Sequence, residues 1–205
     1  MKMGTTSFPA LAFRLAVALV VGVAALSDGA AQVRPTNVAI PLPATSLYRM
    51  NGTWTAHDGR VHTLASLRGE ITVLAMVYTS CTMTCPLITS EMLAVQRALP
   101  PELRKRVRFM LASFDPARDS LSSLRAHVIK MALDDRWLVM RASSSDVRTL
   151  AVLLGVSYRQ LPSGDFDHSN IISVLDADGV VRFQSPRIPA DRPALVGAVI
   201  AATRP

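Results

Sequence analysis

The pattern of hydrophobic and polar positions is most informative between residues 71 and 99. Residues 71–78 (ITVLAMVY) show no polar alternation, which is typical of a strand buried on both faces in the middle of a parallel sheet. From Leu87 the period changes, and apolar residues recur at helical spacing at positions 88, 92, 95 and 99. Pro86 lies at the expected start of the helix, where the backbone N–H that proline lacks would have no partner within the helix. The pattern therefore predicts a buried strand that leads into an amphipathic helix.

Apolar strands and helices alternate along the remainder of the chain. Strands are predicted at 107–114, 137–140, 171–175 and 180–184, and helices at 121–128, 147–154 and 194–202. The strand at 71–78, the helix after it and the strand at 107–114 have the spacing of a parallel pair joined by a right-handed crossover. The Asp-Ala-Asp-Gly turn at 176–179 makes the last two strands an antiparallel hairpin. Residues 160–170 are predicted to form a polar loop.

A short hairpin is predicted ahead of the first buried strand. Residues 54–64 contain an Asp58-Gly59 turn, and Val61 and Leu64 are expected to face inward. We predict an α/β, thioredoxin-like fold: a central mixed β-sheet flanked by helices, with an N-terminal β-hairpin extension. The histidines at positions 57, 62 and 127 are interpreted as solvated surface residues rather than ligands.

The amino end has a hydrophobic pattern of its own. Lys2 and Arg14 precede an apolar run at 15–26, and small residues follow at 29–31, which predicts a secretory signal (1–31) cleaved after Ala31. The run of twelve apolar residues is shorter than the roughly 20 that span a bilayer. Cleavage is therefore favoured, and an uncleaved membrane anchor is the alternative. Residues 32–50, rich in proline, are predicted to be an extended linker, and 51–205 the thioredoxin-like domain.

The chain is basic, with 22 lysines and arginines against 15 acidic residues and a net charge of +7. Cleavage would remove two positive charges and one negative charge and leave +6. Export to the periplasm or another exported compartment argues against nucleic acid as a partner. The basic cluster at 104–108 is interpreted as a solvated connection that permits mild attraction to anionic lipid or an acidic protein.

Both cysteines of the chain, Cys81 and Cys85, lie in the predicted turn from strand to helix. Cys85 lies at or just before the amino end of the helix, where the macrodipole is expected to lower the pKa of its thiol. A structural disulfide is the alternative, because the separation is compatible with disulfide geometry. A closed loop of about five residues contributes only roughly 2 kcal/mol. A reactive or metal-binding pair is therefore favoured over a purely structural one.

The predicted topology brings other polar residues towards the cysteines. The carboxyl ends of the first two parallel strands meet at one sheet edge, which places Asp115 and Asp119 near the cysteine turn. For Asp119, capping of the following helix together with Ser120 is the alternative. In a thioredoxin-like topology the loop entering the penultimate strand packs against this turn, and His168 lies in that loop.

Three segments resemble the Sco/SenC proteins in their order and spacing: YTSCTMTCP at 78–86, SFDPARDS at 113–120 and DHSNIISVLDADG at 167–179. The resemblance covers the chain from about residue 51 to its end. It implies a thioredoxin-like copper-binding factor that assists assembly of cytochrome c oxidase, especially its dinuclear copper site (CuA).

The motif match assigns roles to individual residues. Cys81, Cys85 and His168 correspond to the copper ligands of the family, and Asp115 and Asp119 to acidic residues beside them. The resemblance thus implies a copper chaperone that binds one copper per chain. It also implies two kinds of partner: a thiol reductant protein and a copper recipient, such as cytochrome c oxidase subunit II or another envelope copper enzyme.

The donor types agree with this implication. Thiolates prefer Cu(I), imidazole accepts either oxidation state of copper, and a three-ligand site stays open to an incoming ligand. Oxidation of Cys81 and Cys85 to a disulfide would remove two ligands at once. Asp167 is a candidate for orienting the His168 ring. Met83 is either a soft fourth contact or a cover of apolar surface.

Two enzyme alternatives use the same residues. Cys81 and Cys85 also suit a redox-active pair in a thiol-disulfide oxidoreductase that acts on cysteines of an envelope partner. Against it, three residues rather than the usual two separate the cysteines, and His168 stands where such enzymes typically place a proline. Zinc with water on the same three ligands would be hydrolytic. The sequence offers no general base for it, so it ranks last.

Overall fold

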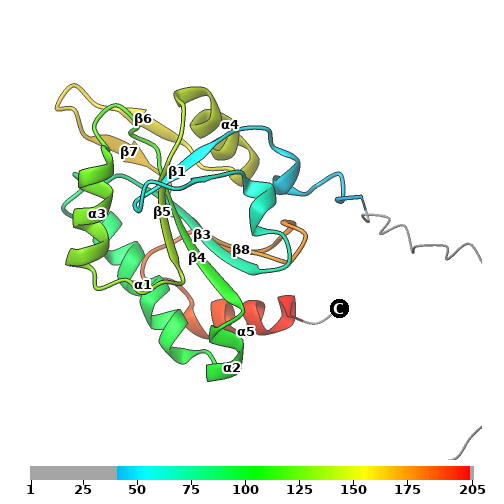
Figure 1. The fold of residues 1–205 in the computed structure, drawn as a ribbon. Helices are drawn as coiled ribbons and strands as arrows, with labels where there is room; N and C mark the ends of the chain where they lie inside the picture. Colours follow the sequence, from blue (N-terminus) through cyan, green and yellow to red (C-terminus); the bar gives the residue numbers. More distant parts are fainter. Residues whose placement is uncertain (1–40, 204–205) are drawn as a thin grey trace, which may run out of the picture. The chain divides into compact units, whose positions relative to one another are not determined.

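A seven-stranded mixed β-sheet forms the centre of the domain, with the strand order β2-β1-β5-β4-β3-β8-β9 (Figure 1). The computed structural model describes residues 41–203 of the chain. The strands of this sheet are β1 Trp54–Ala56, β2 Val61–His62, β3 Ile71–Val77, β4 Val107–Ser113, β5 Trp137–Arg141, β8 Ile172–Leu175 and β9 Val181–Ser185. A second, two-stranded sheet pairs β6 Tyr158–Gln160 with β7 Phe166–His168.

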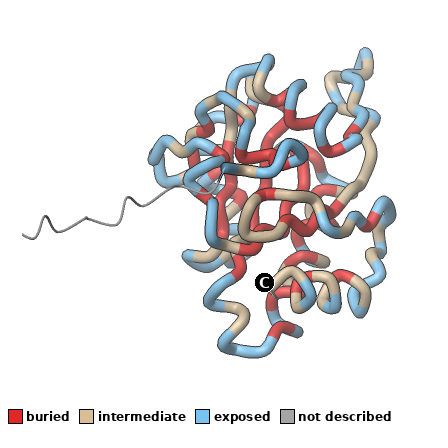
Figure 2. Tube along the Cα trace, turned by 90° about the vertical axis from the view of Figure 1, so that its right-hand side faces the viewer, coloured by how far each residue is buried: buried red, intermediate tan, exposed pale blue. Residues whose placement is uncertain are grey.

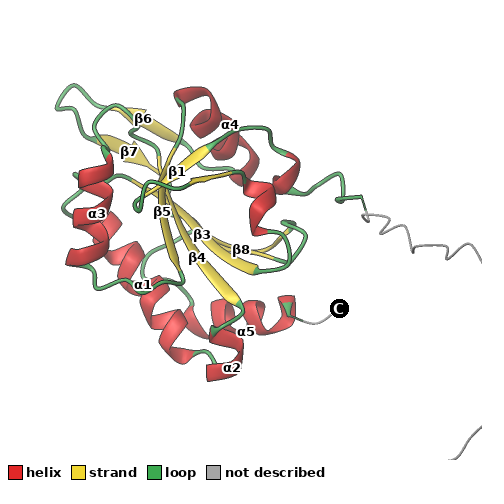
Figure 3. Cartoon of the chain, in the orientation of Figure 1, coloured by secondary structure: helices red, strands yellow, loops and turns green. Residues whose placement is uncertain are grey.

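Helices cover both faces of the central sheet. They are α1 Thr84–Ala98, α2 Pro101–Arg104, α3 Leu121–Lys130, α4 Ser144–Leu154 and α5 Arg192–Ala202 (Figure 3). Helices α1, α3 and α5 lie on one side of the sheet, and α4 lies on the other (Figure 1). This architecture is the predicted thioredoxin-like α/β fold.

Strand β3 is the central element of the sheet. All seven of its residues are buried, and it pairs in parallel with β4 and antiparallel with β8. Strand β4 in turn pairs in parallel with β5. Buried residues follow these strands through the middle of the domain (Figure 2). Because β3, β4 and β5 run in one direction, their carboxyl ends share one edge of the sheet; the sequence predicted this for β3 and β4.

Helix α1 packs on the sheet through the residues that the sequence pattern identified. Ile88, Met92 and Val95 are 0% exposed, and Leu99 just beyond the helix is 2% exposed. Burial of each such side chain contributes about 1.5–3 kcal/mol to folding. The helix begins at Thr84, three residues earlier than the periodicity indicated, so that its first turn contains the second cysteine.

Two parts of the chain differ from the sequence-based expectations. Val61, expected to face inward, is 65% exposed, because Trp54 and Ala56 of β1 fill the core beside this hairpin. Residues 160–170, expected to be a polar loop, contain most of the β6–β7 hairpin. Its strands are too short and polar to give a strand pattern in the sequence.

The amino-terminal expectations are tested only in part. The expected signal (1–31) and the first half of the expected linker lie outside the described residues. Within the second half of 32–50, Leu47–Arg49 form a 3-10 helix instead of an extended segment. Leu47 and Tyr48 are buried there, and the Tyr48 hydroxyl lies 3.1 Å from Thr72 Oγ1 of β3. Within residues 41–203, no helix has the length and apolar character needed to cross a membrane.

Candidate metal centre

The two cysteines lie at the carboxyl edge of β3, in the turn that leads into α1. The backbone N–H of Cys81 donates to the carbonyl of Tyr78 (3.3 Å), and the N–H of Cys85 donates to Cys81 Sγ (3.4 Å). Both cysteines are free thiols. Cys85 is fully buried under the first turn of α1, whereas Cys81 retains 9% exposure. The turn thus presents one sulfur towards the surface and keeps the other in the interior.

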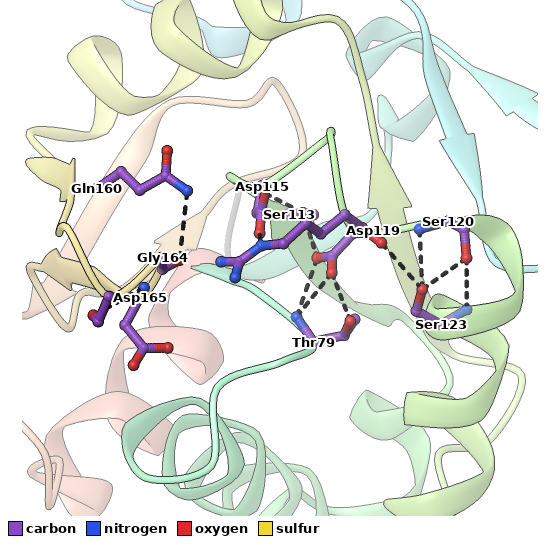
Figure 4. A network of polar contacts seen from close by, with 11 residues as sticks. Thr79, Ser113, Asp115, Asp119, Ser120, Ser123, Gln160, Gly164 and Asp165 are labelled. Carbon is purple, nitrogen blue, oxygen red and sulfur yellow. Dashed lines mark hydrogen bonds and ion pairs between the residues drawn. The ribbon is translucent and has the colours of Figure 1, made fainter.

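Asp119 holds the chain that enters this turn. Its fully buried carboxylate accepts hydrogen bonds from Thr79 N (3.1 Å), Thr79 Oγ1 (2.5 Å) and Ser113 Oγ (2.5 Å) (Figure 4). The cap of α3 is supplied by Ser120, which forms a capping box with Ser123. Asp119 is therefore not a helix cap, and its carboxylate ties the ends of β3 and β4 together.

The third candidate ligand, His168, is the last residue of β7. Its ring packs against Phe114 at 5.0 Å and against Tyr78 at 5.9 Å between ring centroids. The His168 Nδ1 atom lies 3.1 Å from the carbonyl oxygen of Ser169. Because a carbonyl only accepts, Nδ1 carries the proton, and in the neutral ring Nε2 keeps its lone pair. The carbonyl of Ser169 therefore orients the ring. The sequence-based candidate for this role, Asp167, does not.

The Nε2 atom of His168 is directed towards the cysteine turn. Thr84 Oγ1 lies 3.3 Å from this nitrogen and 3.7 Å from Cys81 Sγ. The ligand atoms of Cys81, Cys85 and His168 all lie within 4.8 Å of one another. Among residues 41–203, these three form the only group of three or more His, Cys, Asp or Glu side chains close enough to hold one metal ion.

The two thiols have opposite electrostatic environments. Burial favours the neutral form of Cys81, but hydrogen bonds from the backbone N–H groups of Cys85 and Met83 outweigh it and lower the pKa of Cys81 to about 7. Burial raises the pKa of Cys85, and the neighbouring Cys81 and Asp119 raise it further. The expected reduction at Cys85 is therefore wrong: the hydrogen bonds of the helix amino end act on Cys81.

The other residues considered from the sequence lie outside the group of three. Asp115 is buried and pairs with Arg118. Asp167 is exposed and lies 3.6 Å from Arg159. Met83 is 76% exposed, so it does not cover apolar surface.

Two residues near the candidate ligands differ from what the sequence indicated. His127, expected on the surface, is 8% exposed, and its Nε2 lies 3.3 Å from Thr89 Oγ1 of α1. The position of Thr84 between His168 and Cys81 was not predicted. Its place next to Cys85 in the sequence is the only signal that could have indicated it.

Comparisons with known proteins match this architecture. A family model described as SCO1/SenC matches residues 45–195. The SCO1 protein homolog of Bacillus subtilis (strain 168) is 27% identical over 133 residues, which cover 63% of this chain and 68% of that protein.

Two solved structures share the fold. Bradyrhizobium japonicum ScoI with copper bound is 23% identical with a TM-score of 0.61, covering 71% of this chain and 95% of that one. BsSco, a member of the Sco family of cytochrome c oxidase assembly proteins with a disulfide switch, is 23% identical with a TM-score of 0.62. That match covers 73% of this chain and 90% of that one. Because the family model spans well over half of the sequence, the chain belongs to the SCO1/SenC family.

Proposed function

We propose that this protein is a copper chaperone that binds one copper ion through Cys81, Cys85 and His168. The observation that carries the proposal is the convergence of two sulfurs and one imidazole nitrogen within 4.8 Å. Two thiolates and one imidazole form a soft donor set that suits Cu(I). The copper bound by the related ScoI of Bradyrhizobium japonicum supports copper as the cargo.

The residues around the site suit both binding and release. Cys81, with its lowered pKa, is largely prepared for coordination near neutral pH, whereas the buried Cys85 must lose a proton when the ion binds. His168 presents a lone pair without a tautomer change, because its other nitrogen is held by Ser169. A site with only three protein ligands leaves room for a ligand from the recipient.

The proposed recipient is the CuA site of cytochrome c oxidase or a related copper enzyme of the cell envelope. The motif resemblance and the family of BsSco support this assignment. A thiol reductant protein is the second proposed partner, because copper uptake requires Cys81 and Cys85 as thiols. The predicted secretory signal supports a periplasmic or otherwise exported location, with an uncleaved amino end as the alternative route to membrane association.

Cu(I) titration of the reduced protein tests the ligand set. We expect the protein to bind one equivalent, and Cys81→Ser, Cys85→Ser and His168→Ala each to weaken binding sharply. The oxidised protein should hold little Cu(I), because its disulfide removes two ligands. His127→Ala is a matched control, since His127 lies outside the ligand group. Unchanged Cu(I) affinity in His168→Ala would overturn the proposed ligand set.

A second candidate function is thiol-disulfide exchange with an envelope partner. The specific observation in its favour is the contrast between Cys81, which is 9% exposed and has a lowered pKa, and Cys85, which is fully buried and has a raised pKa. This contrast matches an attacking thiolate and a resolving thiol. If His168→Ala left copper binding intact while the protein reduced disulfides efficiently, this second function would replace the first. Zinc would be favoured instead if the isolated protein carried it and resisted replacement by copper.

A further inference from the structure

The hairpin that carries His168 is attached to the domain without β-ladder hydrogen bonds. Strands β6 and β7 pair only with each other, and neither joins the seven-stranded sheet. An isolated two-stranded hairpin is marginally stable in water. The position of His168 relative to the cysteine turn therefore depends on the short connections of the hairpin to α4 and β8, and on side chains that hold the hairpin against the sheet.

Aromatic rings form most of this attachment. Phe166 of β7 packs against Tyr78 and against Phe114, with 5.2 Å between ring centroids in each pair. Tyr158 of β6 stacks on Phe114, also at 5.2 Å. Tyr78 and Phe114 follow the ends of β3 and β4. The rings thus connect the hairpin to the edge of the sheet that bears the cysteines.

Arg118 closes this aromatic cluster from the loop between β4 and α3. Its guanidinium carbon lies 5.5 Å from the centroid of Phe166 and 5.8 Å from that of Tyr78. The Arg118 side chain is paired with Asp115, whose own side chain is only 4% exposed. A Cβ built at Gly164, in the hairpin turn, would lie 3.5 Å from Arg118 Nη1. One cation therefore contacts both the hairpin and the residue that follows β3.

We propose that Arg118 is a positioning residue for His168: it fixes the β6–β7 hairpin against the cysteine turn and so sets the place of the third ligand. The proposal rests on the proposed copper function, although Arg118 itself does not belong to the ligand group. A cation over two aromatic faces is attracted by both rings. The buried Asp115 carboxylate keeps the guanidinium in that place.

The role predicted for Arg118 differs from that of its neighbour Asp119. Asp119 holds Thr79, and therefore the approach to the cysteines. Arg118 contacts Phe166 of the histidine hairpin and also Tyr78, the residue that follows β3. Loss of the Arg118 charge should therefore affect the imidazole more than the two thiols.

The test replaces Arg118 with methionine, which keeps much of the apolar length of the side chain and removes its charge. Cu(I) affinity is measured by competition with a chromophoric chelator, in the wild-type and His168→Ala backgrounds. We expect Arg118→Met to weaken Cu(I) binding by about three-fold to about thirty-fold when His168 is present. In the His168→Ala background, the same change should have almost no effect, because its target is already absent.

Three further measurements exclude a general structural effect. Arg118→Lys should recover part of the affinity, because it restores a cation. The surface pair of Arg182 with Asp176 offers a matched control, and Arg182→Met should leave Cu(I) affinity unchanged. Alkylation of the two thiols should proceed in Arg118→Met within about two-fold of the wild-type rate.

Amide hydrogen exchange of the reduced, metal-free protein gives a readout independent of copper. Exchange should accelerate in β6 and β7 of Arg118→Met and remain unchanged in β3 and β4. Unchanged exchange in the hairpin would overturn the proposal, as would an equal loss of Cu(I) affinity in the presence and absence of His168. If His168→Ala itself left Cu(I) affinity unchanged, the proposed copper ligands would fail, whereas faster hairpin exchange would still support Arg118 as the residue that fixes the hairpin.

Discussion

Replacement of Asp119 with alanine should be among the most destabilising single changes near the cysteine turn. The carboxylate is fully buried and accepts hydrogen bonds from Thr79 N, Thr79 Oγ1 and Ser113 Oγ. Each buried donor left without an acceptor costs about 1–3 kcal/mol. The two hydroxyls can rotate to other partners, so we expect a total loss of about 3–5 kcal/mol in the free energy of unfolding. Single domains have about 5–15 kcal/mol in all.

Urea unfolding of the reduced, metal-free protein measures this loss. Asp119→Asn should lose only about 1–3 kcal/mol, because one amide oxygen still accepts hydrogen bonds. Glu102→Ala is a suitable control: Glu102 pairs with Lys105, their side chains are 85% and 75% exposed, and such surface pairs contribute about 0–1 kcal/mol. A loss below about 1 kcal/mol in Asp119→Ala would contradict the assignment of Asp119 as the residue that ties the ends of β3 and β4.

Three other predictions concern the thiols, an ion-pair cluster and a tight turn. In the reduced, metal-free protein, Cys81 should be alkylated well before Cys85, and the alkylation rate of Cys81 should rise with pH with a midpoint at about 7. Equal rates for the two thiols would contradict the contrast between their pKa values. Burial opposes ionisation of Glu70, but hydrogen bonds from Arg108 and Arg136 outweigh this effect and lower its pKa. Glu70→Gln should therefore lower the free energy of unfolding by about 1–2 kcal/mol at neutral pH. This deficit, measured by urea unfolding at several pH values, should disappear as the pH falls through the lowered pKa of Glu70, because wild-type Glu70 then also becomes neutral. A Cβ at Gly179 would lie 2.5 Å from the Tyr48 ring, at a residue with φ of +78°, so Gly179→Ala should lower the melting temperature, and an unchanged value would refute this close approach.

The sequence was sufficient to predict the main sheet because burial alone determines its pattern. Strand β3 is apolar at nearly every position, and α1 repeats its buried residues at helical spacing. The right-handed crossover through α1 then makes β3 and β4 parallel neighbours. Because these two strands share a carboxyl edge, the sequence alone predicts that Asp119 lies near the cysteines.

The features that the sequence did not reveal depend on contacts between distant segments. The β6–β7 hairpin has polar strands, and its attachment depends on Tyr78 and Phe114 from other parts of the chain. His127 lies on a helix that looks amphipathic, yet α1 covers it. The pKa contrast between the thiols depends on which sulfur receives the N–H groups of the turn, and spacing alone cannot decide this. Sequence motifs therefore identified the candidate ligands, but not their positioning or their protonation.

The two candidate functions use the same sulfurs, and the difference between them lies in what faces Cys81. An oxidoreductase needs open space beside the attacking sulfur, because a partner disulfide must approach it in line. Here the Nε2 lone pair of His168 is directed into that space, with the Thr84 hydroxyl between the ring and the sulfur. An imidazole in this place adds a ligand for a soft ion. Oxidation of the two thiols to a disulfide would remove both sulfur ligands of such an ion together. The same geometry therefore favours reversible copper binding whose retention depends on the redox state of the cysteines.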